Sequence, residues 1–189
     1  MSLQQQQILQ DPSQPIEPFL KKVLLSLDNQ YSPQKYANVE TYATQFAKQL
    51  KPSAAVIVNG KPIVPEQPSM PDVKLEFQKK WLVTPQTNHQ LTSFDCHLIP
   101  GTGTFIVNAS GKVRFDESGK NRLGENANLV QSTTAPASSN ANRNIWGSWF
   151  GYDLTLVVDE NVRNNDEMEL INSFNYRFTF KPRDSVIQI

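Results

Sequence analysis

The chain has 189 residues, of which 38% are hydrophobic and 10% aromatic, so it fits one domain of ordinary size with its own core. Its 18 basic and 18 acidic side chains balance, which argues against a protein whose main task is to neutralise the phosphates of duplex nucleic acid. Cys96 is the only cysteine, which excludes an internal disulfide and a cysteine-based zinc site. The apolar runs are shorter than the roughly 20 residues of a membrane span, and the N-terminal residues lack the pattern of a secretory signal. We therefore expect an intracellular protein without membrane insertion.

The first part of the chain predicts two helices and a hairpin. Residues 1–13 are rich in Gln, Pro and Ser and are expected to form a disordered tail. Residues 16–27 and residues 36–50 each carry apolar side chains at helical spacing, and Ser32-Pro33 before the second stripe is typical of a helix start. Asn59-Gly60 predicts a tight hairpin, because both central residues of a type I′ turn need positive φ.

The middle of the chain predicts a third helix and two strands. Asp72 is a candidate N-cap for a short helix that ends before Pro85. Period-two alternation then predicts strands at residues 90–99 and 104–115. Gly111 lies inside the second strand, where glycine is typical of a bulge or bend in a curved sheet.

A long polar segment, residues 116–144, interrupts the strands. It is rich in Ser, Asn, Gly, Thr and Ala, and connections beyond ~12–15 residues without secondary structure are usually functional or disordered. Basic residues cluster at its root and are candidate contacts for RNA phosphates, with a solvated loop root as the competing interpretation. These residues are Lys112, Arg114, Lys120 and Arg122.

Two long alternating segments follow, residues 146–158 and residues 168–181. One face of each carries mostly large apolar side chains, starting with Trp146 in the first and Met168 in the second, and predicts a buried core face. The opposite face mixes apolar with hydrogen-bonding side chains, and this composition indicates contact with a partner. That face includes Trp149, Thr155, Val157, Ile171 and Arg177.

The order of the elements predicts an α+β domain. Strands that cluster after helices, rather than alternating with them, indicate helices on one side of a curved sheet. Each large side chain that is fully buried contributes roughly 1.5–3 kcal/mol, so the many inward-facing apolar residues suffice for independent folding. We expect the domain to cover residues 14–182, with the long polar segment as an internal loop and residues 183–189 as a C-terminal tail.

Catalytic chemistry has little support in the sequence. Asp95 and His97 lie two apart on one predicted strand and could form a general-base pair, but polar residues on the non-core face of a sheet are the simpler interpretation. No serine sits in a nucleophile-elbow motif, and the Ser-Gly-Lys repeats at residues 110–112 and 118–120 lack the spacing of a phosphate loop. Two histidines without clustered carboxylates do not make a metal site. We therefore predict no catalytic residue, no metal and no cofactor.

Several strings, in this order and spacing, resemble the nuclear transport factor two-like family. Within that family the chain is similar to the small subunits of mRNA export receptor heterodimers, in their fungal branch, over about residues 15–182. The strings that carry the resemblance are residues 55–60 (AVIVNG), 93–96 (SFDC), 103–107 (GTFIV), 111–115 (GKVRF), 152–156 (YDLTL) and 174–178 (FNYRF).

The resemblance implies a cone-shaped, strongly curved antiparallel sheet with three helices packed on its inner face. It also implies a non-enzymatic subunit that pairs sheet to sheet with a similar domain of the large receptor, through a buried ion pair made by the arginine that is Arg177 here. Such heterodimers carry messenger ribonucleoprotein through nuclear pores by binding Phe-Gly nucleoporins, and the fungal members are also linked to the export of large ribosomal subunits. We therefore expect a protein of the nucleus and nuclear pore complex that shuttles to the cytoplasm. The predicted partner interface is Arg177, Trp149, Thr155, Val157, Ile171, Asn175 and Asp95.

Two other functions remain open. The same cone fold hosts small-molecule isomerases and dehydratases, but here the inward positions are predicted to be Phe, Tyr, Leu and Val, with few titratable groups. The second is a direct contact with RNA or pre-ribosomal particles through the loop at residues 116–144.

Overall fold

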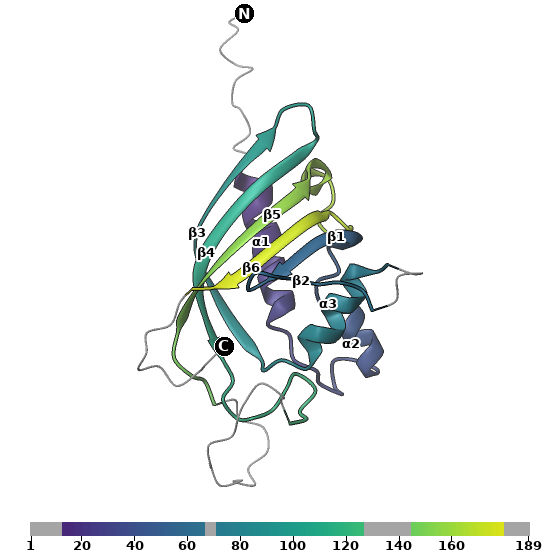
Figure 1. Ribbon diagram of the computed structural model, residues 1–189, viewed down its shortest axis with the longest axis vertical. Coiled ribbons are helices and arrows are strands. Elements are labelled where there is room, and N and C mark those ends of the chain that lie inside the picture. Colours follow the sequence, from purple (N-terminus) through teal and green to yellow (C-terminus); the bar gives the residue numbers. More distant parts are fainter. Residues whose placement is uncertain (1–12, 67–70, 127–144, 180–189) are drawn as a thin grey trace, which may run out of the picture.

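The computed structural model describes residues 13–66, 71–126 and 145–179 (Figure 1). Over these residues the chain forms three α-helices, one short 3₁₀-helix and a six-stranded sheet. In chain order the elements are α1 (Ser13–Leu27), α2 (Val39–Gln45), β1 (Leu50–Val58), β2 (Lys61–Pro62), α3 (Val73–Leu82), β3 (Thr87–Ile99), β4 (Thr104–Phe115), β5 (Phe150–Asp159), η2 (Glu160–Arg163) and β6 (Ile171–Phe178). None of the helices in this described part is long and apolar enough to cross a membrane.

The helices follow the predicted apolar stripes, except that α2 differs from its prediction at both ends. The stripe was expected to continue as helix to residue 50, but α2 ends at Gln45 and Leu50 begins β1. α3 begins after Asp72, whose carboxylate accepts a hydrogen bond from the Leu75 amide at 2.8 Å, as predicted. α2 was expected to start after Ser32 but begins after Asn38, whose side chain accepts from the Thr41 amide at 2.7 Å. The Ser32 hydroxyl bonds the Gln34 side chain instead, so residues 32–35 form a separate turn.

The sheet has the order β2-β1-β6-β5-β4-β3 and is not closed into a barrel. Its neighbours pair antiparallel except β1 and β6, which run parallel, so the sheet is mixed rather than purely antiparallel as predicted. The prediction from the order of elements missed this pairing because it joins the first strand to the last. The predicted hairpin is confirmed: Asn59 and Gly60 both have positive φ, 51° and 76°, between β1 and β2.

Gly111 lies at a bulge, as its position in an alternating run predicts. The β3–β4 register shifts between Leu91 and Ser93, opposite this glycine. A Cβ atom on Gly111 would lie 2.1 Å from the carbonyl oxygen of Gln90, so only glycine allows the two backbones to approach this closely.

The helices lie on one face of the sheet and bury it (Figure 1). α1 packs along β3 and α3 packs against β1. The α+β class and the cone-like arrangement predicted from the sequence are thus confirmed. The core is built from the inward side chains Phe19, Leu20, Leu27, Phe46, Phe77, Trp81, Phe105, Val107, Leu154, Leu156, Phe174 and Tyr176.

The last two strands are shorter than their alternation predicts. β5 begins at Phe150, so Trp146 lies before the strand and is only half-buried. β6 begins at Ile171, and Met168, expected on the core face, is exposed. The expected tails at residues 1–12 and 183–189 and the loop residues 127–144 lie outside the described residues, whereas Ser13 already belongs to α1.

Candidate partner-binding site

The face of the sheet that points away from the helices is assembled by the register of β3, β4, β5 and β6. Directly paired residues of antiparallel strands share a face, so two rows of side chains can be read across the sheet. We call these two rows the outer face. One row is Asp95, Asn108, Thr155 and Asn175, and the next is Ser93, Ser110, Asp153 and Arg177.

Short polar groups on the outer face bond to one another. Thr155 donates its hydroxyl to Asn108 Oδ1 at 3.1 Å, and the Ser93 and Ser110 hydroxyls lie 2.8 Å apart. Residues of both rows line an open depression of about 510 Å³. The outer face is therefore a shallow surface whose central side chains are short and bonded to one another.

The predicted interface residues fall in different places. Thr155, Asn175, Asp95 and Arg177 are exposed on the outer face, and Val157 is half-buried in the next row, paired with Ile106. Their outward direction agrees with the prediction, although their role in binding a partner stays a prediction.

Ile171 was expected on the outer face but lies in the core. The β5–β6 register shifts between Val157 and Val158, so Ile171 pairs with Val158 and Asn172 is the extra residue. Because one inserted residue reverses the side-chain alternation, Ile171 turns inward and is 1% exposed.

Trp149 lies at the end of the outer face and is 38% exposed. The alternating segment was expected to include Trp149, but β5 begins at Phe150, so Trp149 lies just before the strand. The guanidinium carbon of Arg114 lies 4.7 Å from the centre of the Trp149 ring and 4.8 Å from that of Trp146. One arginine thus packs against two indoles that were predicted to lie on opposite faces of the strand.

The basic group at the root of the long loop is not one surface. Lys112 and Lys120 are exposed, and Arg114 is half-buried against the two tryptophans. Arg122 was proposed as an RNA contact, but it is 1% exposed, so it cannot reach a phosphate in this conformation. The local charge pattern alone cannot distinguish a buried arginine from an exposed one.

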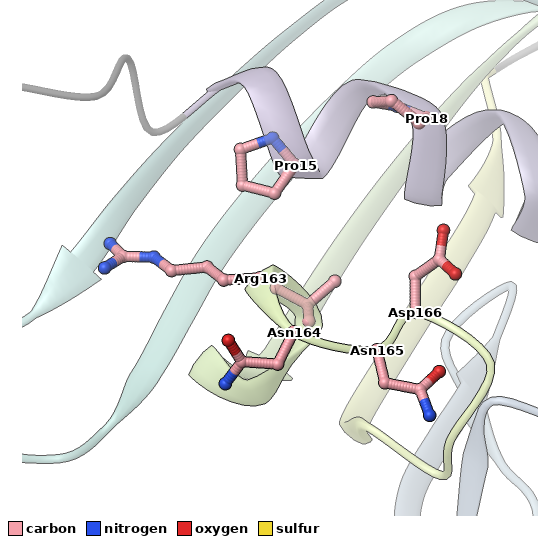
Figure 2. A pocket seen from close by; sticks show the side chains of 7 residues that line it. Pro15, Pro18, Arg163, Asn164, Asn165 and Asp166 are labelled. Atoms are coloured by element: carbon pink, nitrogen blue, oxygen red, sulfur yellow. The ribbon is translucent and has the colours of Figure 1, made fainter.

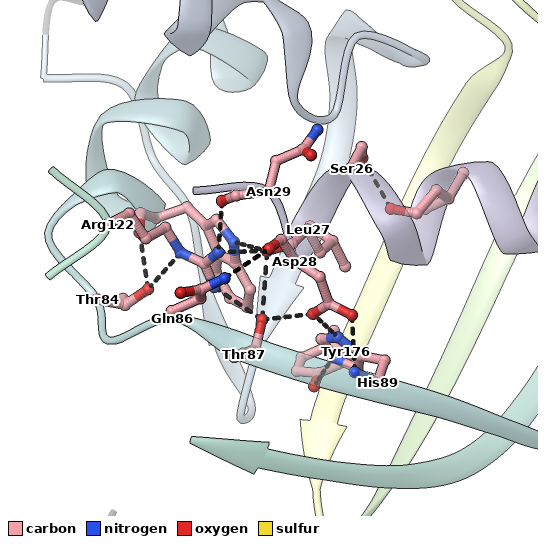
Figure 3. A network of polar contacts seen from close by, with 12 residues as sticks. Ser26, Leu27, Asp28, Asn29, Thr84, Gln86, Thr87, His89, Arg122 and Tyr176 are labelled. Atoms are coloured by element: carbon pink, nitrogen blue, oxygen red, sulfur yellow. Dashed lines mark hydrogen bonds and ion pairs between the residues drawn. The ribbon is translucent and has the colours of Figure 1, made fainter. Parts of the chain in front are cut away.

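Arg122 instead joins the loop root to three elements of the domain (Figure 3). Its Nη1 donates to the carbonyl oxygens of Leu27 and Asn29 at the end of α1, and its Nη2 donates to the Thr87 hydroxyl at 2.8 Å. Its guanidinium also lies 4.9 Å from the Trp81 ring centre. Burial lowers the pKa of Arg122 to about 10, so the side chain is still cationic at neutral pH and suits the negative end of the helix dipole.

A hydrogen-bonded chain of titratable groups runs beside Arg122 into the cone (Figure 3). Asp28 accepts from the Nδ1 atom of His89 at 2.5 Å, and Nε2 of His89 lies 2.6 Å from the Tyr176 hydroxyl. Burial alone would raise the pKa of Asp28, but its hydrogen bonds with His89 and the charge of His89 hold that pKa below its usual value. Burial raises the pKa of Tyr176 well above its ordinary value. The expectation of few titratable groups inside the cone is therefore wrong at this end.

The bulge at Gly111 is the signal that could have placed His89 inside. Alternation over residues 93–99 puts odd-numbered positions outside, and the same rule applied without a break would put His89 outside as well. The inserted residue Thr92 reverses the alternation, so His89 pairs with Val113 and points into the core. Its partner Asp28 lies far from His89 in the sequence, so no local pattern predicts their contact.

A second depression lies where α1 approaches the segment after β5 (Figure 2). It measures about 320 Å³ and is lined by Pro15, Pro18, Val162, Arg163, Asn164, Asn165 and Asp166. Its one carboxylate, Asp166, is paired with Lys22 at 2.7 Å. Neither depression reaches the chain from Asp28 to Tyr176, and no three His, Cys, Asp or Glu residues in the described part of the protein are grouped to hold a metal.

The fold defines the class of protein. A solved structure described as a putative dehydratase from the NTF2-like family of Streptomyces avermitilis superposes with a TM-score of 0.50 over 90% of this chain and 97% of that one, at 9% identity. Such a likeness shows the fold alone: an NTF2-like α+β cone, in which partner-binding proteins and enzymes both occur.

Sequence comparison then gives the family. The chain belongs to the Mtr2 family of nuclear pore RNA shuttling proteins, whose model matches residues 4–189. It is 57% identical over 183 residues to the mRNA transport regulator MTR2 of Candida albicans, covering 95% of this chain and 99% of that protein. In the crystal structure of the C. albicans Mtr2–Mex67 M domain complex, a chain with 59% identity superposes with a TM-score of 0.76 over 92% of this chain and 99% of that chain. The resemblance found in the sequence is thereby confirmed.

Proposed function

We propose that this chain is the non-enzymatic small subunit of a heterodimeric mRNA export receptor and that its outer face binds a domain of a Mex67-type large subunit. The complex between C. albicans Mtr2 and the Mex67 M domain supports a partner of this kind. The outer face is the observation that carries the proposal: the described helices all pack on the other side, and no described element covers the four adjacent strands.

The side chains of the outer face are suited to packing against the sheet of another domain. Thr155 and Asn108 at its centre are short and already bonded to each other, so covering them removes few flexible side chains from water. Half-buried Ile106 and Val157 supply apolar area in the adjoining row. An obligate pairing of this kind is expected to bury more than ~2,000 Å².

The test is a substitution at the centre of the outer face. Thr155→Arg introduces a long cation where a flat surface must close, and we expect it to abolish binding to the partner domain in titration calorimetry. Thr44→Arg is the matched control, because Thr44 is exposed on α2, on the helical side of the domain. Both variants should keep the unfolding midpoint of the unmodified chain. Unchanged affinity of the folded Thr155→Arg variant would sink the proposal.

Pairing with the large subunit would place the chain in nuclear export. We extend the proposal to location at the nuclear pore complex with shuttling to the cytoplasm, to binding of Phe-Gly nucleoporins by the heterodimer, and to a role in export of large ribosomal subunits. A fluorescently tagged chain should concentrate at the nuclear rim, and the Thr155→Arg variant should lose this concentration while Thr44→Arg keeps it. An equal rim signal for both variants would show that localisation at the pore does not depend on pairing with the large subunit.

Direct contact with RNA or pre-ribosomal particles through the long loop is a second candidate. Exposed Lys112 and Lys120 favour it, although the burial of Arg122 removes one of the four cations first assigned to it. Deleting residues 127–143 tests this role and leaves the buried root at Arg122 intact. RNA affinity that is unchanged at several salt concentrations would remove it, since phosphate contacts give a salt-dependent affinity.

The structure contains side chains that an enzyme could use, but a substrate cannot reach them. The chain from Asp28 through His89 to Tyr176 contains a carboxylate, an imidazole and a phenol, as a proton-transfer site needs. However, the His89 side chain is 0% exposed, and its two ring nitrogens are both occupied by protein partners. A substrate would have to displace Asp28 or Tyr176 to reach them. We therefore assign this chain of contacts to stability rather than to catalysis.

A further inference from the structure

The contact of Arg114 with two tryptophans lies at one end of the outer face. The last β4–β5 pair is Val113 with Phe150, so the next positions outward, Arg114 and Trp149, come opposite each other. An isolated β-bridge between Asp116 and Trp146 places the second indole next to this pair. We call Trp146, Arg114 and Trp149 the tryptophan–arginine cluster. It continues the outer face along β4, where Asn108, Ser110, Lys112 and Arg114 point outward in turn.

The positive charge at this end of the outer face is not neutralised by the described residues. Arg177 shares its charge with Asp153 at 3.5 Å, but neither Arg114 nor Lys112 forms an ion pair within the described part of the chain. Arg114 Nε is buried without a hydrogen-bond partner there. The two terminal nitrogens of its guanidinium therefore form the end that can meet a ligand.

We infer that the tryptophan–arginine cluster is a docking point for a carboxylate side chain of the same partner that covers the outer face. This inference rests on the proposed function and names the chemistry of one contact within it. Two indoles hold the guanidinium in a fixed orientation before binding, so little side-chain entropy is lost when it is engaged. With Nε buried, the two terminal nitrogens present parallel donors that match the two oxygens of a carboxylate.

A protein carboxylate fits this site better than a nucleic acid. Binding of nucleic acid draws its affinity from many phosphate contacts, whereas this end of the outer face offers two cations, and the chain as a whole carries a formal net charge of zero. The cluster is also continuous with a surface that is shaped for another sheet. An acidic residue on the partner's rim would therefore meet Arg114 when the two sheets close.

The experiment measures the affinity of the full chain for the Mex67-type M domain by titration calorimetry. Arg114→Met keeps an unbranched stem without the charge, and we expect it to weaken binding by about tenfold or more. Arg114→Lys should show most of the same loss, because lysine keeps the charge but offers no planar pair of donors. Trp149→Ala should weaken binding severalfold and Trp149→Phe should restore it. Lys79→Met, on the exposed side of α3, is the matched loss of charge and should leave the affinity unchanged.

The outcomes separate this inference from the proposed function. If Thr155→Arg abolishes binding while Arg114→Met leaves it unchanged, the pairing stands and the docking point is wrong. If Arg114→Lys binds as tightly as the unmodified chain, only charge matters and the bidentate contact is wrong. If Arg114→Met reduces affinity for a single-stranded oligonucleotide but not for the partner domain, the ligand is a nucleic acid and the inference is overturned. Circular dichroism of every variant confirms that the chain is folded.

Discussion

Arg177 and Asp153 face each other across β6 and β5, and Nε of Arg177 lies 3.5 Å from Oδ2 of Asp153. Their side chains are 66% and 42% exposed in the free chain, so the pair is solvated and contributes about 0–1 kcal/mol to folding. Both residues would be desolvated if the outer face closed on a partner. In the proposed complex the pair would therefore influence binding more than stability, because the same charges interact more strongly once water is excluded.

We predict that Arg177→Ala weakens binding to the partner domain by about 2–5 kcal/mol, because it would leave the partner's carboxylate unpaired in a buried interface. Asp153→Asn should have a smaller effect, since Arg177 keeps its charge and its place on β6. Titration calorimetry on the two single variants and the double variant gives the coupling between them. Affinity that survives Arg177→Ala would show that the ion pair implied by the family resemblance does not form here.

Arg122 is predicted to be a stability residue rather than a binding residue. Removing its guanidinium leaves carbonyl oxygens of Leu27 and Asn29 with fewer partners and opens a space beside Trp81. We expect Arg122→Ala to lower the free energy of unfolding by about 3–5 kcal/mol, measured by urea denaturation. Exposed Lys120, two residues earlier, is the matched control, and Lys120→Ala should stay within about 0.5 kcal/mol. A loss below about 1 kcal/mol for Arg122→Ala would show that its contacts are dispensable.

Local patterns predicted the elements well where one residue decides the geometry. The cap at Asp72, the turn at Asn59 and the bulge at Gly111 each depend on a single residue type with a specific backbone preference. These signals can be recognised in a single sequence because they do not depend on contacts between distant segments. The helices and the outward positions of Thr155 and Arg177 followed from periodicity in the same way.

The predicted side-chain directions were wrong where an inserted residue or a partner far away in the sequence determines whether a residue is buried. The shifts near Ile171 and His89 each reverse a side-chain alternation, and nothing at Ile171 itself marks the reversal. Arg122 looked like part of a basic surface because its neighbours are polar, but its partners come from α1 and β3. Such contacts between segments far apart in the chain are invisible to a reading of local composition.

The lowered pKa of Asp28 predicts how the free energy of unfolding depends on pH. Its carboxyl has a folded pKa below the ordinary value of 3.8, so the folded state binds fewer protons than the unfolded state near that pH. The stabilisation is therefore fully present above pH 3.8 and is lost as the pH falls below it, through the folded pKa. Asp28→Asn should lower the free energy of unfolding at neutral pH, and this difference should shrink in acid.

The measurement is urea unfolding of the unmodified chain and the Asp28→Asn variant from neutral pH down to about pH 3. His89 is the principal hydrogen-bonding partner of Asp28, so in a His89→Gln background the effect of Asp28→Asn should become smaller and less dependent on pH. A stability difference between the unmodified chain and the Asp28→Asn variant that stays constant with pH would contradict the assignment of the shift to this pair.

Asp116 closes the base of the long loop, because it binds both sides of the insertion. Its Oδ1 accepts from the Ile145 amide at 2.8 Å and from the Ser118 amide at 3.1 Å, and Oδ2 accepts from the Ser118 hydroxyl. Next to it, the Gly147 amide donates to the carbonyl oxygen of Phe115 at 2.9 Å. These bonds hold residues 145–149 alongside the end of β4.

We predict that Asp116→Ala costs about 1–3 kcal/mol of unfolding free energy, because three donors lose a buried acceptor. It should also speed hydrogen exchange at the Ile145 and Gly147 amides well before global unfolding, since the segment that carries both tryptophans would open locally. Asp116→Asn keeps one oxygen that can accept from the Ile145 amide and should retain part of the protection. Exchange at these two amides that is unchanged in Asp116→Ala would mean that the Arg114 contacts with Trp146 and Trp149 hold the segment by themselves.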